Sequence, residues 1–510
     1  MLAVVKSVCL LGLNGFIVDV EVDISPGLPG FDIVGLPNTS VKESKERVRA
    51  AIKNTGLDFP LGRITVNLAP ANIKKAGPAF DLAIAVGLLA ATGQISSEDF
   101  DKYIFLGELS LDGSIRGVAG VLPSVLFAAE NSHAKAVIVP CDNADEAALP
   151  NRMNIYPAPN LRTLVKFFFK AETIPVHTVN LDNLLTGGSS ATIEDMADVR
   201  GHYKVKRALE IAAAGGHNIL LTGPPGSGKT MMARRFAGIT PNMSFEEALE
   251  STKIYSVAGL LKADTPLIAC RPFRSPHHSA SRAGMVGGGS IPKPGEISLS
   301  HNGILFMDEF TEFNKDILEC LRQPLEEGTI CISRVNANVE YPARMILVAA
   351  MNPCPCGFFG DAARECTCTP IQIIRYRSIL SGPLLDRIDL HVEVPRTQYH
   401  ELQDNTKSEG SEKIRARVES ARLLQRSRLA GTGIETNARM GNRELRLFCQ
   451  LSRKAAALLK IAFERLNLSA RGYNRILKVA RTIADLKGLE NIAEQHIAEA
   501  IQYRSSDRAF

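Results

Sequence analysis

The sequence predicts an α/β protein built around a parallel sheet, and three observations support this fold class. Between residues 195 and 396, short apolar runs alternate with helix-compatible segments, which is the pattern of strands linked by crossover helices. A glycine-rich loop at residues 223–230 joins one apolar run, residues 218–222, to a segment that favours a helix. Beyond about residue 400 the periodicity becomes helical, as at residues 412–429.

A separate α+β unit is expected before this core. Apolar and polar residues alternate at residues 15–23, and residues 64–68 and 136–139 are short β-rich runs, as strands are. Residues 41–54 have the spacing of an amphipathic helix. A stretch rich in Gly, Ser and Thr then predicts a flexible linker. The predicted units are residues 1–175, a linker at 176–194, the core at 195–398 and a helical region at 399–510.

The composition argues against a membrane span. The longest apolar stretch, residues 82–92, is well short of the ~20 residues that a spanning helix needs. The apolar residues 2–13 lack a basic leader and a clear cleavage site, so a cytoplasmic location is expected. The net charge of +5 is mild, but basic residues concentrate between residues 413 and 481. That concentration indicates either a polyanionic partner or a solvated helical face.

Ten cysteines in a cytoplasmic chain need an explanation other than disulfides. Cys354 and Cys356 lie close in sequence to Cys366 and Cys368, and four thiolates within so short a span predict a structural tetrahedral zinc site. The C-x-C spacing is less usual than C-x-x-C, and reduced thiols or a redox-labile loop are the alternatives. The other six are predicted to be buried apolar residues: Cys9, Cys141, Cys270, Cys320, Cys331 and Cys449.

The glycine-rich loop has the chemistry of a phosphate cradle. Its glycines let backbone N–H groups turn towards phosphate oxygens at the positive end of the following helix. Lys229 is expected to contact the β- and γ-phosphates, and the Thr230 hydroxyl to ligate Mg²⁺. A full match between a strand and a helix predicts ATP binding. The loop consists of Gly223, Pro224, Pro225, Gly226, Ser227, Gly228, Lys229 and Thr230.

Two further strand ends complete the predicted site. The apolar run at residues 303–307 delivers Asp308 and Glu309 to the carboxyl edge of the sheet, where ligands bind in open α/β folds. Asp308 is expected to hold the Mg²⁺ shell and Glu309 to polarise the attacking water, which predicts hydrolysis of the nucleotide. Another run, residues 345–351, ends at Asn352, an amide that could orient the water; a turn-forming Asn before a proline is the alternative.

Residues 198–202 and 206–217, followed by the glycine-rich loop, resemble the magnesium-chelatase-like branch of the AAA+ ATPases. The whole chain is similar to the ComM/YifB family, bacterial proteins of DNA uptake and recombination. The resemblance implies a P-loop AAA+ core with a helical lid, working as a ring-shaped homohexamer. It also implies that Val199, Gly201 and His202 border the adenine.

The resemblance assigns three more roles. Asn352 corresponds to sensor 1. Arg387 matches the arginine finger that reaches the ATP of the neighbouring subunit, a contact worth roughly 10³ to 10⁵ in rate. Arg471 is the best match to sensor 2 in the helical lid, with Arg475 as the fallback.

Two insertions mark this branch, one at residues 251–300 and one at residues 329–344, and the second is expected to be a hairpin. In related ring helicases such insertions face the pore, where a basic side chain can grip phosphate. Arg274, Lys293 and Arg334 are therefore the predicted DNA contacts.

The first insertion also contains two adjacent histidines, His277 and His278, in a loop with prolines. They are not expected to bind a metal ion, because the sequence places no carboxylate near them.

The N-terminal unit resembles the protease domain of Lon at residues 75–82 and 107–120. Lon cleaves with a Ser in a Gly-Pro-Ser turn and a Lys after the later glycine motif, but these positions hold Ala79 and Leu122. Without the hydroxyl there is no nucleophile, and without the amine there is no base, so protease activity is not expected. The unit is expected to act as an assembly or DNA-binding collar, as in the RadA-type recombination proteins that it also resembles.

Together these features predict an ATP-dependent DNA translocase or helicase that promotes branch migration of recombination intermediates in natural transformation. The expected cofactors are ATP, Mg²⁺ and structural zinc. The expected partners are single-stranded or branched DNA, with recombinase machinery as a further candidate. The alternative is the ATPase motor of a metal-insertion complex, which ranks second because the genuine chelatase motor is not expected to carry a Lon-like domain. A regulator of a protease is the third interpretation.

Overall fold

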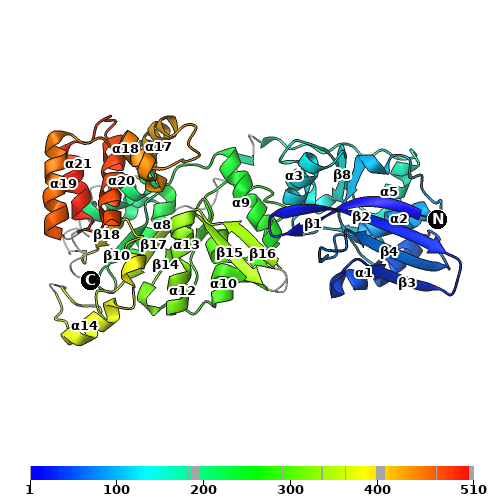
Figure 1. The fold of residues 1–510 in the computed structure, drawn as a ribbon, viewed down its shortest axis with the longest axis horizontal. Coiled ribbons are helices and arrows are strands. Elements are labelled where there is room, and N and C mark those ends of the chain that lie inside the picture. The colour runs from blue at the N-terminus through cyan, green and yellow to red at the C-terminus, as the bar shows by residue number, and fades with distance from the viewer. Residues whose placement is uncertain are drawn as a thin grey trace.

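The computed structural model describes residues 2–181, 184–185, 194–289, 292–334, 337–361, 363–397, 408–466 and 468–504. Figure 1 shows an elongated molecule with an α/β unit from the N-terminal part of the chain at one end, a second sheet in the middle and C-terminal helices at the other end. In the described part of the chain, every helix is too short or too polar to cross a lipid bilayer. The predicted linker at residues 176–194 lies mostly outside the described residues.

The N-terminal unit is built on a seven-stranded mixed sheet with the order β3-β4-β2-β1-β5-β8-β9. β1 pairs antiparallel with β2 along its whole length, and β2 pairs antiparallel with β4. The other neighbouring strands are parallel. The strands are β1 (Leu2–Leu11), β2 (Asn14–Ser25), β3 (Gly30–Val34), β4 (Arg63–Ala69), β5 (Tyr103–Phe105), β8 (Ala136–Pro140) and β9 (Asn154–Ala158), with a small ribbon of β6 (Glu108–Leu109) and β7 (Ile115–Arg116). The strands predicted from alternation and β-branching are confirmed.

One apolar helix, α2 (Asp81–Ala91), forms the centre of this unit. Residues 81–89 are all buried, because the helix is apolar on every face and is enclosed by the sheet and α1. Its single charge, Asp81, is matched by Arg47, whose Nε lies 2.6 Å from Oδ2. The remaining helices are α1 (Thr39–Asn54), α3 (Val121–Asn131), α4 (Ala144–Ala148) and α5 (Leu161–Phe168).

The middle of the molecule is a five-stranded parallel sheet, as the alternating pattern predicts, with the order β11-β14-β17-β10-β18. Its three central strands carry almost only buried apolar side chains, as strands covered on both faces do. The strands are β10 (Ile219–Thr222), β11 (Phe273–Arg274), β14 (Ile304–Met307), β17 (Ile346–Met351) and β18 (Leu390–Glu393).

Because all five strands are parallel, the sheet has one carboxyl edge and one amino edge, and both matter for the site. The carboxyl edge leads into residues 223–228, Asp308 and Asn352. Asn218 links neighbouring segments at the amino edge. Its Oδ1 accepts from the Leu347 amide at 2.9 Å, and its Nδ2 donates to the main-chain carbonyl of Arg387 at 3.1 Å.

Helices and two insertions surround this sheet. The second insertion is an antiparallel hairpin of β15 (Thr329–Arg334) and β16 (Ala337–Pro342), as predicted. The first contains α10 (Arg282–Val286), β12 (Gly287–Gly288), β13 (Lys293–Pro294) and α11 (Glu296–Leu299). The other helices of the middle unit are α7 (Tyr203–Gly215), α8 (Lys229–Ile239), α9 (Phe245–Ala258), α12 (Lys315–Cys320), α13 (Arg322–Glu327), α14 (Pro370–Arg377) and α15 (Gly382–Leu385).

The C-terminal part is helical, as its periodicity predicts. One hydrophobic core runs from the sheet into these helices, because α17 packs on α7 and α8 while α20 packs on α7. The helices are α17 (Ser411–Arg428), α18 (Asn442–Phe448), α19 (Arg453–Leu466), α20 (Ala470–Leu486) and α21 (Glu494–Gln502).

The N-terminal unit contacts the middle unit along α3 and α9 (Figure 1). Leu122 and Leu149 pack against Met243 in a small apolar cluster. The Ser256 hydroxyl of the middle unit also donates a hydrogen bond to the Glu146 carboxylate of the N-terminal unit. The turn between β1 and β2 packs beside the apolar cluster under the hairpin.

The prediction that the six scattered cysteines are buried is partly wrong. Cys9 and Cys449 are buried, but Cys141, Cys270 and Cys331 are exposed. Apolar composition around a cysteine is a local signal, whereas its burial depends on which element packs over it.

Candidate functional site

A strand, a loop and a helix position the predicted phosphate cradle. Residues 223–228 lie between β10 and α8. Gly226 and Gly228 have φ angles of +76° and +84°, in the left-handed region that glycine enters without a Cβ clash. At Gly223 the requirement is space, because a Cβ there would lie 2.2 Å from a backbone carbonyl oxygen. The loop therefore has the backbone that aims N–H groups at an anion in front of a helix.

Lys229 folds back over this loop. Its Nζ donates to the carbonyl oxygens of Gly223 at 2.7 Å and Pro224 at 2.9 Å. Burial lowers the pKa of its ammonium group, and the charge of Asp308 opposes that shift. The Ser227 hydroxyl is 1% exposed and has no hydrogen-bond partner among the described residues. A nucleotide phosphate would accept from both groups, so the residues present fit the ligand that the sequence predicts.

Asp308 and Glu309 follow β14 and have different surroundings. The Thr230 hydroxyl donates to Asp308 Oδ2 at 2.6 Å, so two oxygen ligands of the kind that Mg²⁺ prefers lie together beside the loop. Glu309 has a φ of +49°, which is uncommon for a residue other than glycine, and its side chain is 57% exposed. The carboxylates point to different surroundings, as two separate roles require.

Asn352 follows β17 at the same edge. Its Oδ1 lies 3.3 Å from Lys229 Nζ, so the amide and the ammonium group meet beside the glycine-rich loop. The structure thus brings Asn352, Lys229, Thr230 and Asp308 into one cluster.

The residues predicted to border the adenine also lie at the carboxyl edge. His202 has a φ of +53°, and its Nε2 is 2.9 Å from the Thr397 hydroxyl, which follows β18. Val199 is fully buried, and its carbonyl accepts from Ser408 Oγ at 2.9 Å. Gly201 provides the left-handed turn between them, with a φ of +64°.

Arg387 and Arg471 lie at the other, amino edge of the sheet. Both guanidinium groups pair with the Glu326 carboxylate, Arg471 at 3.2 Å. Arg475 is nearly buried and pairs with Asp389 at 3.4 Å. The strands between the two edges are four to six residues long, which is roughly 13–20 Å at about 3.3 Å per residue. Neither Arg387 nor Arg471 therefore lies at the glycine-rich loop of its own chain.

The four clustered cysteines form a compact sulfur group. Sγ of Cys354 lies 3.3 Å from that of Cys356 and 3.7 Å from that of Cys366, and the four Sγ atoms, with Cys368, all lie within 4.8 Å of one another. Four thiolates around Zn²⁺ at about 2.3 Å would be about 3.8 Å apart, so the group could hold a tetrahedral metal ion. Backbone N–H groups already donate to two of the sulfurs.

The cysteine loop also touches the phosphate cradle. Gly357 has a φ of +83°, and a Cβ at this position would lie 2.6 Å from Cδ of Pro225. The loop therefore packs directly on the second proline of the glycine-rich loop.

The three predicted DNA contacts have different outcomes. Arg274 is bound within the chain, because its guanidinium makes two hydrogen bonds of 2.6 Å to the Glu296 carboxylate. Lys293 is exposed in β13. Arg334 ends β15, but its side chain lies outside the described part of the chain.

Much of the basic C-terminal region is neutralised internally. Arg417 pairs with Glu210 at 2.6 Å, and Arg428 and Arg481 both pair with the buried Asp485. The local excess of basic residues is therefore an incomplete guide to a polyanion-binding face, since the matching acids come from distant parts of the sequence.

A histidine contact is the feature that the sequence did not predict. His278 Nδ1 lies 3.1 Å from Glu309 Oε2, and the His277 ring packs against the His278 ring with centroids 4.1 Å apart. The prediction that no carboxylate lies near these histidines is therefore wrong, because Glu309 is distant in sequence but close in the fold. The loop after β11 ends at the same sheet edge as β14, and this shared edge was the signal available.

The positions that resemble the Lon dyad lie in apolar surroundings. Ala79 packs beside a cluster that contains Val121, and the side chain of Leu122 is fully buried. The absence of protease activity stays a prediction.

Fold and site together define a P-loop nucleotide-binding protein of the magnesium-chelatase-like AAA+ class. Three family models match: "Magnesium chelatase, subunit ChlI" at residues 195–402, "Subunit ChlI of Mg-chelatase" at 20–143, and "Magnesium chelatase, subunit ChlI C-terminal" at 408–504. Membership of this class suggests ATPase activity and implies ATP and Mg²⁺ as cofactors.

The full-length relatives narrow the class to one family. Competence protein ComM of Haemophilus influenzae is 45% identical over 99% of this chain and 98% of its own. The uncharacterised protein YifB of Salmonella typhimurium is 46% identical, and YifB of Escherichia coli 45%, with the same coverage. The chain belongs to the ComM/YifB family.

Proposed function

We propose that this protein is an ATP-driven DNA translocase or helicase that promotes branch migration of recombination intermediates, acting as a ring-shaped homo-oligomer. The cycle would begin with MgATP on the glycine-rich loop. Lys229 and the backbone N–H groups hold the phosphates, Thr230 and Asp308 hold Mg²⁺, and Glu309 accepts a proton from the attacking water.

The proposal of a ring-shaped assembly rests on one observation, which is that the proposed catalytic groups lie on two opposite edges of one sheet. The phosphate cradle lies at the carboxyl edge, while Arg387 and Arg471 lie at the amino edge beside Glu326. Those guanidinium groups cannot reach a nucleotide on their own chain. A neighbouring chain that presents its carboxyl edge would receive both, so Arg387 acts as an arginine finger and Arg471 as a second sensor across the subunit boundary.

The proposal of DNA as the polymer rests on the insertions and on one relative. The β15–β16 hairpin forms one insertion, and Lys293 is exposed in the other. The relative from Haemophilus influenzae bears the name of a competence protein. In this proposal the N-terminal unit, with its Lon-like pattern, serves as a collar, and the C-terminal helices serve as the lid of the ATPase unit.

The test compares wild type with Lys229→Ala, Glu309→Gln and Arg387→Ala for nucleotide binding, DNA-stimulated ATPase rate and branch migration of three-stranded and four-way substrates. We expect Lys229→Ala to lose ATP binding. We expect Glu309→Gln to bind ATP but hydrolyse it at least about 100-fold more slowly. Arg387→Ala should bind ATP normally and lose roughly 10³-fold in rate. Branch migration that survives in all three variants would refute the proposal.

Zinc in the cysteine group is a further part of this proposal. A bound Zn²⁺ would fix the loop that packs on Pro225, and it has no role in the chemical step. The ion would act on the geometry of the phosphate cradle alone.

The second candidate function is the ATPase motor of a metal-insertion complex, which the descriptions of the three matching family models favour. ATPase stimulation by a chelatase partner and a porphyrin, with no response to DNA, would establish this alternative in place of the first.

A further inference from the structure

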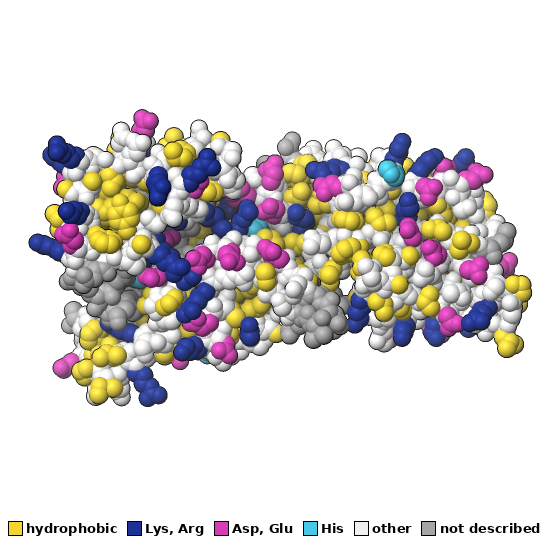
Figure 2. Space-filling model, viewed as in Figure 1, with side chains coloured by type: hydrophobic (Ala, Val, Ile, Leu, Met, Phe, Trp, Pro, Cys, Tyr) yellow, Lys and Arg dark blue, Asp and Glu magenta, His cyan; other side chains and the backbone are white. Residues whose placement is uncertain are grey.

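The helix α14 has one face towards solvent and one face towards the catalytic strands. Ile371 and Ile374 are 77% and 68% exposed, and Figure 2 shows hydrophobic side chains on the surface at the lower left, where Figure 1 labels α14. Ile373 is buried, and the Tyr376 ring packs on the apolar cluster that contains Phe310. Because the described residues of this chain cover only one face of the helix, a small number of contacts set its position.

The Tyr376 hydroxyl joins two segments at the carboxyl edge of the sheet. The Thr311 hydroxyl, two residues beyond Glu309, donates to Tyr376 Oη at 2.5 Å. The backbone N–H of Asn352 also interacts with this oxygen. Burial raises the pKa of the Tyr376 phenol, and the contacts with Thr311 and Asn352 oppose that rise. One phenol oxygen therefore meets both the turn that follows β14 and the residue that follows β17.

The turn after β14 needs a restraint of this kind, because its first residue has an unfavourable backbone conformation. Glu309 has a φ of +49°, and its carbonyl accepts from the Glu312 amide at 2.7 Å, which closes the short 3₁₀ turn η5 (Phe310–Glu312). A residue other than glycine keeps such a φ only where its surroundings fix it. Two contacts in the turn do so, since Phe310 is fully buried and Thr311 is bound to Tyr376.

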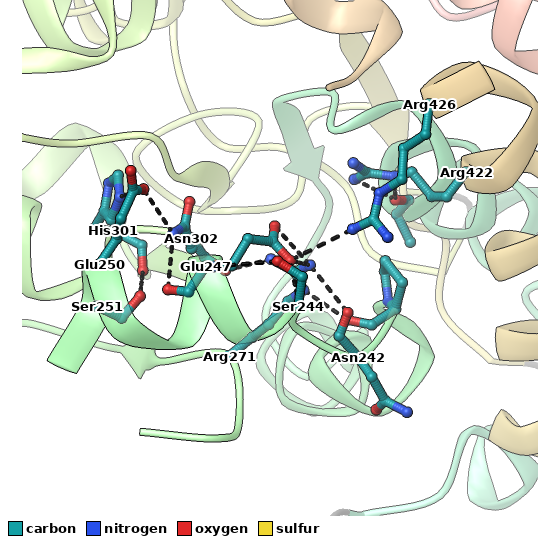
Figure 3. Close-up of polar contacts among 12 residues, drawn as sticks. Asn242, Ser244, Glu247, Glu250, Ser251, Arg271, His301, Asn302, Arg422 and Arg426 are labelled. Atoms are coloured by element: carbon teal, nitrogen blue, oxygen red, sulfur yellow. Dashed lines mark hydrogen bonds and ion pairs between the residues drawn. The ribbon is translucent and has the colours of Figure 1, made fainter. Parts of the chain in front are cut away.

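The amino end of β14 is held by a separate set of contacts. His301 Nε2 lies 3.1 Å from the Glu250 carboxylate, and the Ser251 hydroxyl donates to the His301 main-chain oxygen at 3.2 Å (Figure 3). The Arg344 amide donates to His301 Nδ1 at 3.0 Å. These contacts join the start of β14 to α9 and to the segment before β17. The strand therefore keeps its place without Tyr376, and loss of the Tyr376 hydroxyl would loosen only the residues after the strand.

We propose that Tyr376 is a positioning residue for ATP hydrolysis, whose hydroxyl fixes Glu309, through Thr311, relative to Asn352. In the proposed reaction the water oxygen bonds to the terminal phosphorus, the bond to ADP breaks, and the water proton goes to the Glu309 carboxylate. Proton transfer needs the base within hydrogen-bond reach of the water, so a loosened Glu309 slows the chemical step and leaves ATP binding at the glycine-rich loop intact. This role rests on the proposed hydrolysis of ATP, and it does not depend on DNA being the polymer.

The experiment measures single-turnover hydrolysis of bound ATP, the Kd for ATP and the melting temperature of the full chain. We expect Tyr376→Phe to hydrolyse ATP about tenfold more slowly, with a Kd within about twofold of wild type, because it loses only neutral hydrogen bonds to one hydroxyl. Thr311→Val should also be slower, whereas Thr311→Ser keeps the hydroxyl and should hydrolyse ATP at the wild-type rate. The double variant of Tyr376→Phe with Thr311→Val should be no slower than Tyr376→Phe alone, since both changes remove the same bond.

Tyr341→Phe is the matched control, because it removes a tyrosine hydroxyl from another part of the middle unit. Tyr341 is fully buried in β16, and its hydroxyl donates to the main-chain oxygen of Pro292 at 2.7 Å. The control should melt at a lower temperature and, without DNA, hydrolyse ATP at the wild-type rate. Equal rates in Tyr376→Phe and this control would overturn the proposal. A double variant whose loss equals the product of the two single losses would overturn it too.

Glu309→Gln separates a failure of this role from a failure of the proposed function. Hydrolysis at the wild-type rate in Glu309→Gln would overturn the assignment of the base and, with it, the role of Tyr376. A loss in Glu309→Gln together with a wild-type rate in Tyr376→Phe would overturn the role of Tyr376 alone. A loss of ATP affinity in Tyr376→Phe as large as its loss of rate would show that the hydroxyl supports the whole site structurally, which would also overturn the proposal.

Discussion

Gly357→Ala is expected to disturb the ATP site from the cysteine loop. The added Cβ would lie 2.6 Å from Cδ and 2.8 Å from Cγ of Pro225, where ordinary contact begins at 3.4 Å. The two loops must therefore separate by about 0.8 Å. A displacement near 1 Å in a group that positions a substrate can cost about 100-fold in rate, so we expect kcat/KM for ATP to fall by about 10- to 100-fold.

Gly360→Ala in the same loop is the matched control. Gly360 has a φ of +78°, close to the +83° of Gly357, but a Cβ there would have no neighbour within 4 Å. Both substitutions carry the left-handed backbone cost of about 1–2 kcal/mol, and only Gly357→Ala adds the contact with Pro225. The free energy of unfolding and the steady-state ATPase parameters are measured for both. Equal ATPase parameters in the two variants would refute the coupling between the loops.

The other predictions concern the metal, the histidine and the joint between the units. If the cysteine group holds zinc as proposed, purified wild type contains it by atomic absorption, Cys354→Ser and Cys368→Ser should lose it, and Cys331→Ser, an exposed control, should retain it. His278→Ala should raise the basal kcat for ATP severalfold with KM unchanged, because the Glu309 carboxylate loses its partner at 3.1 Å; an unchanged or lower kcat contradicts this. Although burial alone would raise the pKa of Asp389, the hydrogen bond with His217 and the charge of Arg475 hold it well below its usual range. That stabilisation is present above about pH 4 and is lost as the pH falls towards the folded-state pKa, so Asp389→Asn should cost roughly 3–5 kcal/mol at pH 7 and flatten the acid side of the unfolding curve.

The nucleotide side of the site was predictable because its signals are local. Asp308 and Asn352 each follow an apolar run directly, and the glycine-rich loop that leads to Lys229 follows a third run, so a strand prediction brings all three to one edge of the sheet. The glycines indicate the loop in the sequence, because the loop needs positive φ angles that are unfavourable for other residues. The same reasoning predicts the separate N-terminal sheet and the C-terminal helices.

The remaining features depend on contacts between residues far apart in sequence. Arg471 meets Glu326 across 145 residues, and Arg417 meets Glu210 across 207. No periodicity encodes such a pairing, because the side of the sheet on which the helices dock is set by the shared core of α7, α17 and α20. For the same reason the sequence could name Arg387 and Arg471 as partners of a nucleotide without showing that they lie together on the far edge.

The division of the sheet into two edges has a consequence for assembly. In the proposed mechanism each copy offers a phosphate cradle on one side and guanidinium groups on the other, so association is head-to-tail and each working site belongs to two copies. An isolated copy has no complete site, and an open row of copies has one complete site fewer than it has copies. Only a closed ring completes every site, so the turnover per chain should rise steeply with protein concentration until the ring closes.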